Sequence, residues 1–371
     1  MRIGLEISTL AQPYRSGIGR YAAGLTSGLR ALASSEPLEL RPYCHLKKLR
    51  DRRHATDVFE SGFQLWRDPW LRPRRLDVMH ATSWRLPAHG RMARVATIHD
   101  LYSFIGINFR DDSRAAQEQA RYPHLLQHAD AIICVSDNTR RDLLCHFDVD
   151  PQRVHVVPLG VDDCYAPVDA AQQTAIRDRL SAGRPYLLGV GLAAGLDVRR
   201  ANKNLPRLLD AWSRCAMRRH YRLVVTGGVD RDEQCALEAH LRERRLDDSV
   251  VVAGFVEESD MPALYSAAAA VLLPSLYEGY GLPIVEAMAC GAPVLTSRSG
   301  SCPETAAGHA TLVDASSVDA IAQGLHTVLD TPASTRQAAM RHAHAQRWRG
   351  VAAKTLKVYR RAIATARARR R

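Results

Sequence analysis

Short apolar segments alternate with longer amphipathic segments along nearly the whole chain, and this alternation constrains the fold more than any other feature. The apolar segments have the length of strands, and the segments between them have the spacing of helices. Alternation in two blocks predicts an α/β protein with two parallel, doubly wound domains. Strands are expected at 2–7, 77–80, 94–98, 131–135 and 154–157 in the first block, and at 186–191, 221–226, 250–253, 270–273 and 293–296 in the second.

The segments between these strands supply the helices. A chain of 371 residues is long enough for two domains that each bury a core. The proline- and glycine-containing segment 158–185 is interpreted as the connection between the blocks. Ligands of doubly wound sheets bind where strands end, so functional side chains are expected in the loops after strands. Helices are expected at 17–33, 114–128, 137–146, 203–218, 232–245, 260–268 and 283–290, followed by a helix-rich segment from 318 onward.

The stretch 274–291 carries the strongest functional signal. It reads Pro-Ser-Leu-Tyr-Glu-Gly-Tyr-Gly-Leu-Pro-Ile-Val-Glu-Ala-Met-Ala-Cys-Gly and runs from an apolar strand into a helix. Glu278 lies in the loop and Glu286 about one turn into the helix, and both carboxylates can accept hydrogen bonds from hydroxyls. Gly279 and Gly281 allow a close backbone approach, and free amides at a helix start favour phosphate. The stretch therefore predicts a pocket for a ligand with hydroxyls and phosphate, such as a nucleotide-sugar.

Three other segments follow predicted strands. Residues 15–21 read Arg-Ser-Gly-Ile-Gly-Arg-Tyr and open a helix, but they lack the third glycine of a dinucleotide-binding fingerprint. His99 and Asp100 come directly after a strand. Residues 199–205 read Arg-Arg-Ala-Asn-Lys-Asn-Leu, and cations there would stabilise a departing diphosphate.

Taken together, these motifs closely resemble the donor-site signature of retaining glycosyltransferases of the GT-B type, in the large bacterial family 4 (glycosyl transferases group 1). The resemblance covers roughly residues 1–345. It implies two Rossmann-like domains with an interdomain cleft. The implied parts are an acceptor-binding domain at 1–165, a linker at 166–185, a nucleotide-sugar-binding domain at 186–345, and a basic helix at 346–371 that packs back on the N-terminal domain.

The resemblance implies donor-binding roles for residues of the second block. Glu286 would hold the ribose hydroxyls, and Glu278 would contact sugar hydroxyls near the reacting centre. Lys203 would grip the phosphates. The usual arginine position holds Asn202, so Arg199 or Arg200 would have to replace it, and we take Arg200 as the candidate. The remaining donor contacts would come from Val256 at the nucleobase and from the backbone around Gly279, Tyr280, Gly281 and Leu282.

In the first block, the resemblance places Gly19 against the donor phosphate and the acceptor. His99 would contact the donor sugar, and Asp100 would orient it or bind the acceptor. Ser136, a predicted helix cap, and Arg140 are the further acceptor candidates.

GT-B enzymes generally need no bound metal, so we expect neither a metal nor another cofactor. Asp148-Val-Asp150 and Asp230-Arg-Asp232 match the Asp-x-Asp pattern that holds metals in GT-A enzymes, but both are expected in polar loops beside helices. The implied reaction transfers a sugar with retention at C1. A same-face, oxocarbenium-like route is expected, and a covalent carboxylate intermediate is the alternative.

The resemblance is strongest to mannosyl and rhamnosyl transferases of bacterial O-antigen and exopolysaccharide assembly. It favours a GDP-linked donor and a lipid-linked saccharide acceptor. Alternatives are a UDP-sugar donor with a different acceptor, a nucleotide-sugar 2-epimerase of the same fold, a soluble enzyme similar to glycogen or sucrose synthases, and a non-catalytic nucleotide-sugar-binding subunit.

The net charge of +12 is unevenly distributed. Residues 41–75 hold ten Lys or Arg against four acids, with Phe and Trp between them, and 354–371 hold eight basic residues and no acid. This pattern indicates an anionic membrane surface. The alternatives are ordinary solvated faces and nucleic acid, but no nucleic-acid-binding signature accompanies the charge. We expect a peripheral protein on the inner face of the cytoplasmic membrane that binds no nucleic acid.

The remaining features agree with an intracellular location. Eight cysteines lack any Cys-x-x-Cys pair, which fits free thiols in a reducing compartment. The N-terminus has too short an apolar stretch for a signal peptide, because Glu6 interrupts it. No apolar run approaches the roughly 18 residues of a membrane span.

Overall fold

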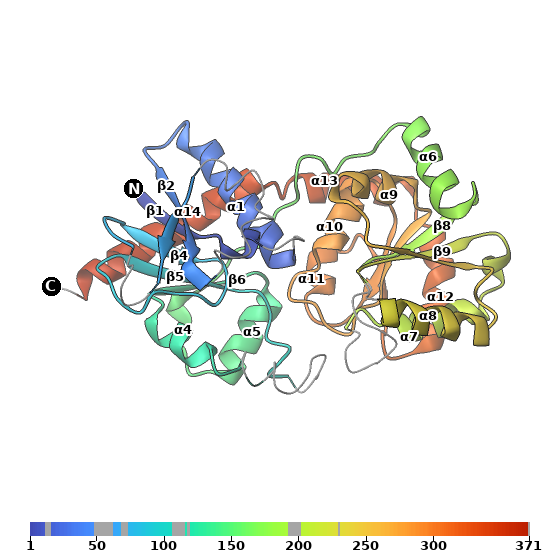
Figure 1. The fold of residues 1–371 in the computed structure, drawn as a ribbon, viewed down its shortest axis with the longest axis horizontal. Helices are drawn as coiled ribbons and strands as arrows, with labels where there is room; N and C mark the ends of the chain where they lie inside the picture. Colours follow the sequence, from blue (N-terminus) through green and yellow to red (C-terminus); the bar gives the residue numbers. More distant parts are fainter. Residues whose placement is uncertain are drawn as a thin grey trace. The chain divides into compact units, whose positions relative to one another are not determined.

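The structure is a computed structural model that describes residues 1–11, 16–47, 62–67, 73–105, 116, 119–191, 202–228 and 231–369. The chain divides into two compact units. Unit 1 contains Met1–Ile105, Ser113–Gly160 and Gln346–Arg371, and unit 2 contains Val161–Ala345. Each unit is a parallel sheet covered by helices on both faces (Figure 1).

Unit 1 has a sheet with the strand order β3-β2-β1-β4-β5-β6-β7, and every pairing is parallel. The strands are β1 (Arg2–Glu6), β2 (Glu39–His45), β3 (Gln64–Trp66), β4 (Val78–Ala81), β5 (Ala93–Ile98), β6 (Ala131–Cys134) and β7 (Val154–Val156). The helices are α1 (Gly17–Ala33), α4 (Tyr122–His128), α5 (Asp137–His146) and α14 (Trp348–Ala368), with short 3₁₀ segments at Ser8–Ala11 and Pro151–Arg153.

Alternate residues of the central strands serve the two helix layers of unit 1. Ala96 and Ile98 of β5 pack with α4 and α5 in one apolar cluster. Thr97 points the other way, toward α1 and α14, as the period-2 geometry of a strand requires. Helix α14 packs against α1 and also contacts β4, β5 and β6 (Figure 1). The Trp348 ring lies so close to Gly24 of α1 that a Cβ there would collide with it.

Unit 2 has the strand order β10-β9-β8-β11-β12-β13, again with parallel pairings. Its strands are β8 (Tyr186–Gly189), β9 (Arg222–Thr226), β10 (Val250–Gly254), β11 (Ala270–Leu273), β12 (Val294–Ser297) and β13 (Thr311–Val313). The helices are α6 (Ala170–Ser181), α7 (Leu205–Arg214), α8 (Arg231–Glu243), α9 (Met261–Ala267), α10 (Leu282–Ala289), α11 (Cys302–Ala306), α12 (Val318–Leu329) and α13 (Ala333–His344), with 3₁₀ segments at Ala216–Arg219 and Glu258–Asp260.

The main core of unit 2 lies under α7, α8 and α12, around the fully buried Trp212. Helices α9, α10 and α13 contact one another in a second group, α10 packing with each of the other two, and Figure 1 shows this group apart from α7, α8 and α12. Proline at the first turn helps to start α7, α9 and α10, since its missing N–H has no partner there in any case.

The predicted α/β class with two doubly wound parallel sheets is confirmed. Strands β2, β3 and β13 were not predicted, because they are short or carry polar residues and, in β2, Pro42. Of the helix expected at 114–128, the structure assigns α4 from Tyr122, and the described residues Ala116 and Gln119 are also helical. Helix α1 has the predicted bounds.

Each sheet reverses its strand order at one position, between β1 and β4 in unit 1 and between β8 and β11 in unit 2. The loops after these strands diverge there and leave room for a ligand. Ligand-binding residues are therefore expected in the segments after Glu6 and Ala81 in unit 1, and after Gly189 and Leu273 in unit 2.

Candidate functional site

An ion pair spans the switch point of unit 2. Lys203, in the segment between β8 and α7, donates from Nζ to Oε1 of Glu278, which follows β11, over 2.6 Å. The two side chains are 21% and 11% exposed. The two residues that the sequence suggested for phosphate and sugar are therefore brought together at a position that solvent still reaches.

Two contacts hold the Lys203 loop against the loop that follows β11. The Leu276 amide donates to the Asn202 carbonyl over 2.8 Å. Asn204 is buried in a left-handed conformation, and its side-chain amide donates to the carbonyls of Pro274 and Ala315. Asparagine tolerates this conformation better than most residues, so it can turn the chain and also anchor it. No sequence motif had singled out Asn204 for this role.

A second loop supports Glu278 from behind. Ser301 donates to the Glu278 carbonyl from both its amide and its hydroxyl, over 3.2 and 3.0 Å. Gly300 has a φ of +57°, and a Cβ there would lie 2.8 Å from the Glu278 carbonyl oxygen. Only glycine fits so close to this backbone in that conformation. The Glu278 backbone is therefore fixed independently of its ion pair.

The helix after Glu278 positions the second carboxylate. Gly281 caps α10 with a φ of +93°, and Glu286 lies on the second turn with only 2% of its surface exposed. Its Oε2 accepts a hydrogen bond of 2.9 Å from the Tyr265 hydroxyl. The predicted place of Glu286 in the helix is confirmed, whereas Tyr265 was not singled out from the sequence.

The other donor-site candidates of unit 2 have different environments. Tyr280 and Leu282 are buried, and the Tyr280 carbonyl accepts from the Thr305 hydroxyl over 2.6 Å. Burial raises the pKa of Tyr280, so its phenol stays neutral. Gly279 is half-buried. Val256 is also half-buried and follows the edge strand β10, next to the exposed Phe255.

In unit 1, His99 lies at the end of β5. Its Nε2 donates to the Thr82 carbonyl over 2.8 Å, and the Tyr21 ring packs edge-on against it at 5.0 Å. Burial lowers the pKa of His99 to about 4. The ring is therefore neutral near pH 7, with the proton on Nε2, and Nδ1 is left as a hydrogen-bond acceptor suited to a sugar hydroxyl.

A buried polar network lies behind His99. The Tyr21 hydroxyl and His80 Nε2 both bond Thr97 Oγ1, at 2.9 and 2.7 Å, and His80 Nδ1 bonds the Tyr359 hydroxyl at 2.6 Å. Burial lowers the pKa of His80 to about 3. The network connects α1, β4 and β5 with α14. The sequence analysis missed it, because its members are up to 279 positions apart.

The remaining candidates of unit 1 are partly engaged in local structure. The Gly19 amide donates to Ser16 Oγ, which caps α1. Ser136 is buried and caps α5, as predicted, by accepting from the Thr139 amide. The Asp100 carbonyl accepts from the Tyr122 hydroxyl over 2.7 Å, and Arg140 is half-buried on α5.

Several predicted residues lie outside the described part of the chain. Arg199 and Arg200, the proposed arginine partners of Lys203, are among them, as are Asp230 and Arg15. So are Lys48, Arg50, Arg52, Arg53 and Arg72 of the basic segment.

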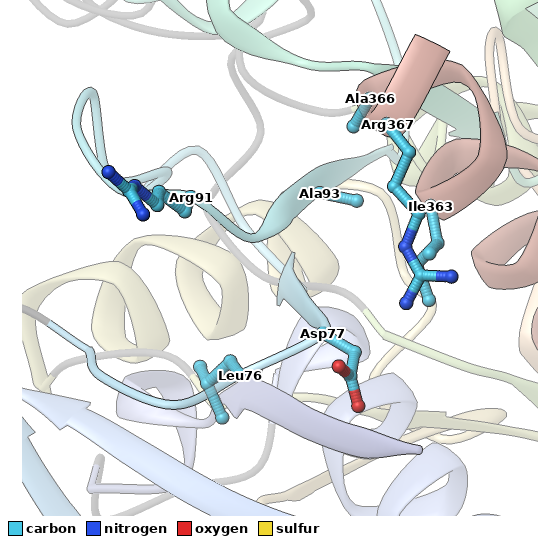
Figure 2. A pocket seen from close by; sticks show the side chains of 7 residues that line it. All are labelled: Leu76, Asp77, Arg91, Ala93, Ile363, Ala366 and Arg367. Carbon is cyan, nitrogen blue, oxygen red and sulfur yellow. The ribbon is translucent and has the colours of Figure 1, made fainter. Parts of the chain in front are cut away.

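Unit 1 also has a pocket of about 170 Å³ at the amino ends of its central strands, where β4 and β5 begin. Its lining includes Asp77, Arg91 and Ala93, together with Ile363 and Arg367 of α14. Figure 2 shows Arg367 reaching from α14 toward the side that holds Asp77, with Arg91 on the other side. Because it lies at the amino ends of the strands, this pocket is not part of the candidate site.

Among the described residues, no group of three or more His, Cys, Asp or Glu side chains is placed to hold a metal ion. No helix in the same residues is long and apolar enough to cross a membrane.

The chain is similar to known proteins over most of its length. Residues 16–164 match the glycosyltransferase family 4 model, and residues 196–347 match the model for glycosyl transferases group 1. The chain is 28% identical to the O-antigen chain mannosyltransferase B of Escherichia coli over 82% of this chain and 85% of the relative. It is 30% identical to a D-inositol 3-phosphate glycosyltransferase of Kribbella flavida, covering 79% and 73% of the two chains.

Among solved structures, the sucrose-phosphate synthase of Thermosynechococcus elongatus superposes with a TM-score of 0.72 at 20% identity, over 98% of this chain and 99% of that one. This likeness concerns the fold. With the family models and relatives, it shows that this chain belongs to glycosyltransferase family 4, the glycosyl transferases group 1, and is an enzyme with the GT-B fold.

Proposed function

We propose that the enzyme transfers a hexose or deoxyhexose of the mannose or rhamnose type, with retention at C1, from a GDP-linked donor to a lipid-linked saccharide. The product would belong to a bacterial surface polysaccharide such as an O-antigen or exopolysaccharide. The relative from Escherichia coli is named an O-antigen chain mannosyltransferase, and a second relative, from Mycolicibacterium hassiacum, is also a mannosyltransferase.

The observation that carries the proposal is the Lys203–Glu278 pair at the switch point of unit 2. When a diphosphate donor binds, Lys203 can turn from the carboxylate to the phosphates and stabilise the charge that develops as they leave. Glu278 is then free to accept hydrogen bonds from hydroxyls of the transferred sugar. Glu286, held by Tyr265, is assigned to the ribose hydroxyls.

In the proposed reaction, the bond between sugar C1 and the phosphate oxygen breaks first. The acceptor hydroxyl attacks C1 from the face the phosphate has left, and its proton passes to a phosphate oxygen. Unit 1 is assigned to the acceptor, with Arg140 and Asp100 as contacts and Ser136 placing the start of α5. The neutral Nδ1 of His99 would accept from a sugar hydroxyl.

We also propose that the enzyme works at the anionic inner face of the cytoplasmic membrane, where a lipid-linked acceptor is available. Exposed cations of the basic segment support this, including Lys47 and Arg74. Charge reversal at Lys47, Arg50 and Arg53 should reduce association with anionic vesicles. Unchanged association would contradict the membrane part of the proposal and leave the chemistry unaffected.

A thermal-shift panel followed by a transfer assay tests the proposed function. GDP-mannose and GDP should raise the melting temperature more than UDP-glucose and UDP do. The labelled sugar should then appear on a lipid-linked saccharide, with its anomeric configuration retained. Stronger stabilisation by UDP would make the enzyme a UDP-sugar transferase, and conversion of the donor sugar without any acceptor would make it an epimerase.

A further inference from the structure

Trp84 is an exposed tryptophan at the switch point of unit 1. It lies three residues after β4, and 40% of its surface is accessible. Leu86, two residues later, is buried. Within the described chain, Phe255 of unit 2 is the other large apolar side chain with comparable exposure. An exposed indole at the edge where a doubly wound sheet binds its ligand suggests a ligand contact.

The Trp84 loop is firmly anchored. The Thr82 hydroxyl donates to the Glu6 carbonyl over 2.5 Å, and the Thr82 carbonyl accepts from His99. The Glu6 carboxylate is buried at the end of β1 and accepts from the Ser83 hydroxyl and the Ser8 amide, both at 3.0 Å. Thr82 therefore ties the segment that carries Trp84 to both β1 and His99, and Ser83 ties it to β1 a second time.

Two guanidiniums lie on the Trp84 ring. The Cζ atoms of Arg85 and Arg121 are 4.2 and 3.9 Å from the ring centroid. Arg121 comes from the start of α4, so the cations arrive from different elements. Among the described residues, neither guanidinium has an ion pair or a side-chain hydrogen bond. Burial lowers the pKa of Arg85, Arg121 lowers it further, and Glu6 raises it.

Within the described residues, the charge of Glu6 acts on Arg85, but neither guanidinium is bound directly to an anion. A cation–π contact at an exposed ring contributes only about 0.5–1 kcal/mol, whereas a guanidinium binds phosphate through two parallel hydrogen bonds. The charge of Arg121 lowers the pKa of the partly buried Arg85, so the two cations repel each other. A phosphate group placed between them would relieve this repulsion and satisfy both donors.

We propose that Trp84, Arg85 and Arg121 form an acceptor subsite that binds a phosphate or diphosphate attached to the acceptor saccharide. The guanidiniums bind the phosphate oxygens, and the part of the indole that they leave exposed contacts the neighbouring sugar. The inference rests on the proposed function, because it assigns the anion to the acceptor and not to the donor. It names the substrate class as a saccharide carried on a phosphorylated aglycone.

The test compares two synthetic acceptors that carry the same saccharide, one on an alkyl diphosphate and one on a neutral alkyl chain. Arg121→Gln should raise KM for the diphosphate acceptor roughly tenfold, since a charge-assisted hydrogen bond is lost. KM for the neutral acceptor and for the donor should stay within twofold. Arg121→Lys should recover part of the affinity, and Trp84→Ala should weaken binding of both acceptors.

Arg91→Gln is the matched control, because Arg91 is an exposed arginine near the amino ends of the strands, whereas Trp84 follows a carboxyl end. It should change none of these constants. If Arg121→Gln affects both acceptors equally, the phosphate assignment is wrong. If it raises KM for the donor, the subsite belongs to the donor diphosphate and the inference also fails.

A binding experiment separates this inference from the proposed function. Inorganic pyrophosphate should quench a component of the tryptophan fluorescence that is missing in Trp84→Phe and weakened in Arg121→Gln. That result supports the anion subsite even if no sugar is transferred to either acceptor. Quenching that is the same in wild type and Arg121→Gln contradicts the subsite, whatever the transfer assay shows.

Discussion

The two units have the same strand order around their switch points, but the charged residues at these points differ in burial and bonding. Unit 2 has the Lys203–Glu278 ion pair there, and both side chains are partly exposed. Unit 1 has Glu6 at the corresponding strand end, but this carboxylate is fully buried and bonded to Ser8 and Ser83. Burial raises the pKa of Glu6.

The difference shows that one topology can provide a charged site or a rigid support. In unit 2 the carboxylate and the ammonium group are themselves the proposed functional groups. In unit 1 the acid fixes a loop, and the groups proposed to face a ligand are neutral His99 and the cations on Trp84. Variants should therefore affect catalysis most in unit 2, whereas in the support of unit 1 they should affect stability more than catalysis.

The largest effect is expected at the unit 2 ion pair. Glu278→Gln or Lys203→Met should lower kcat by about 10²–10³-fold, because each removes a charge that is preorganised at the reacting group. Each should also destabilise unit 2 by roughly 1–3 kcal/mol, because the remaining charge loses its partner. Initial rates with saturating donor and chemical denaturation measure the two effects.

A double variant and a control make this prediction specific. Glu278→Gln with Lys203→Met should regain stability but not activity. Arg214→Met breaks an equally short but exposed ion pair, the one between Arg214 and Asp319. It should leave kcat unchanged and lower the free energy of unfolding by less than about 1 kcal/mol. Near-normal turnover in either single variant would refute the site.

Acid should weaken unit 1 before unit 2. Burial lowers the pKa of His80 and His99 to about 3 and about 4, below the ordinary value of 6.5. Between pH 6.5 and 4 the unfolded chain therefore binds more protons than the fold, and stability is lost as pH falls. The raised pKa of Glu6 works in the opposite direction. Each histidine should contribute a loss of up to about 1.4 kcal/mol per pH unit in this range, and Glu6 reduces the total.

Hydrogen exchange can follow this loss separately in the two units. Protection of β4 and β5 should decrease between pH 6.5 and 5, while that of β11 and β12 should stay nearly constant. In unit 2 burial lowers the pKa of the half-buried His342, and the same sign applies there on a smaller scale. Equal loss of protection in both units would contradict the comparison.

The same contrast explains what the sequence could predict. The groups of unit 2 lie mostly in one contiguous string, so the order and spacing of its residues were enough to place Glu278 and Gly281 in a loop and Glu286 in a helix. The central strands are continuous apolar runs and were also predicted. Strand β2, at Glu39–His45, could not be recognised, because its residues are mostly half-exposed and include Pro42.

The candidate site residues of unit 1 were harder to predict from the sequence, because folding brings them together from distant segments. The bond between His80 and Tyr359 joins positions that no local pattern connects. Trp84 and Arg85 do follow a predicted strand, which is the one signal that could have singled them out. Arg121 becomes relevant only when α4 places it on the same ring.

A moderate effect is expected for Glu286→Gln, which keeps the shape of the side chain and removes its charge. KM for the donor should rise roughly tenfold, because a charge-assisted hydrogen bond to the ribose is weakened. The kcat value should change little. Wild type should bind GDP more tightly than 2′,3′-dideoxy-GDP, and the variant should discriminate less between them. Unchanged discrimination would remove Glu286 from the ribose site.

The smallest effect is expected for Tyr359→Phe, which removes a buried hydroxyl bonded to His80 at 2.6 Å. The fold should lose about 1–3 kcal/mol because His80 Nδ1 is left buried without its partner. Thr355→Val is the matched control in α14, since that hydroxyl bonds the Val351 carbonyl of its own helix, and it should cost less.

The effect of Tyr359→Phe on activity shows whether the position of His99 depends on the hydrogen bond between Tyr359 and His80. His99 is held directly by Thr82 and packs on Tyr21, so the loss of one more distant bond should leave kcat within about threefold. A large fall in kcat at normal stability would mean that α14 positions His99 through His80 and Thr97. Unit 1 would then resemble unit 2 in placing its functional group through a polar chain, and the proposed division between a charged site and a rigid support would not hold.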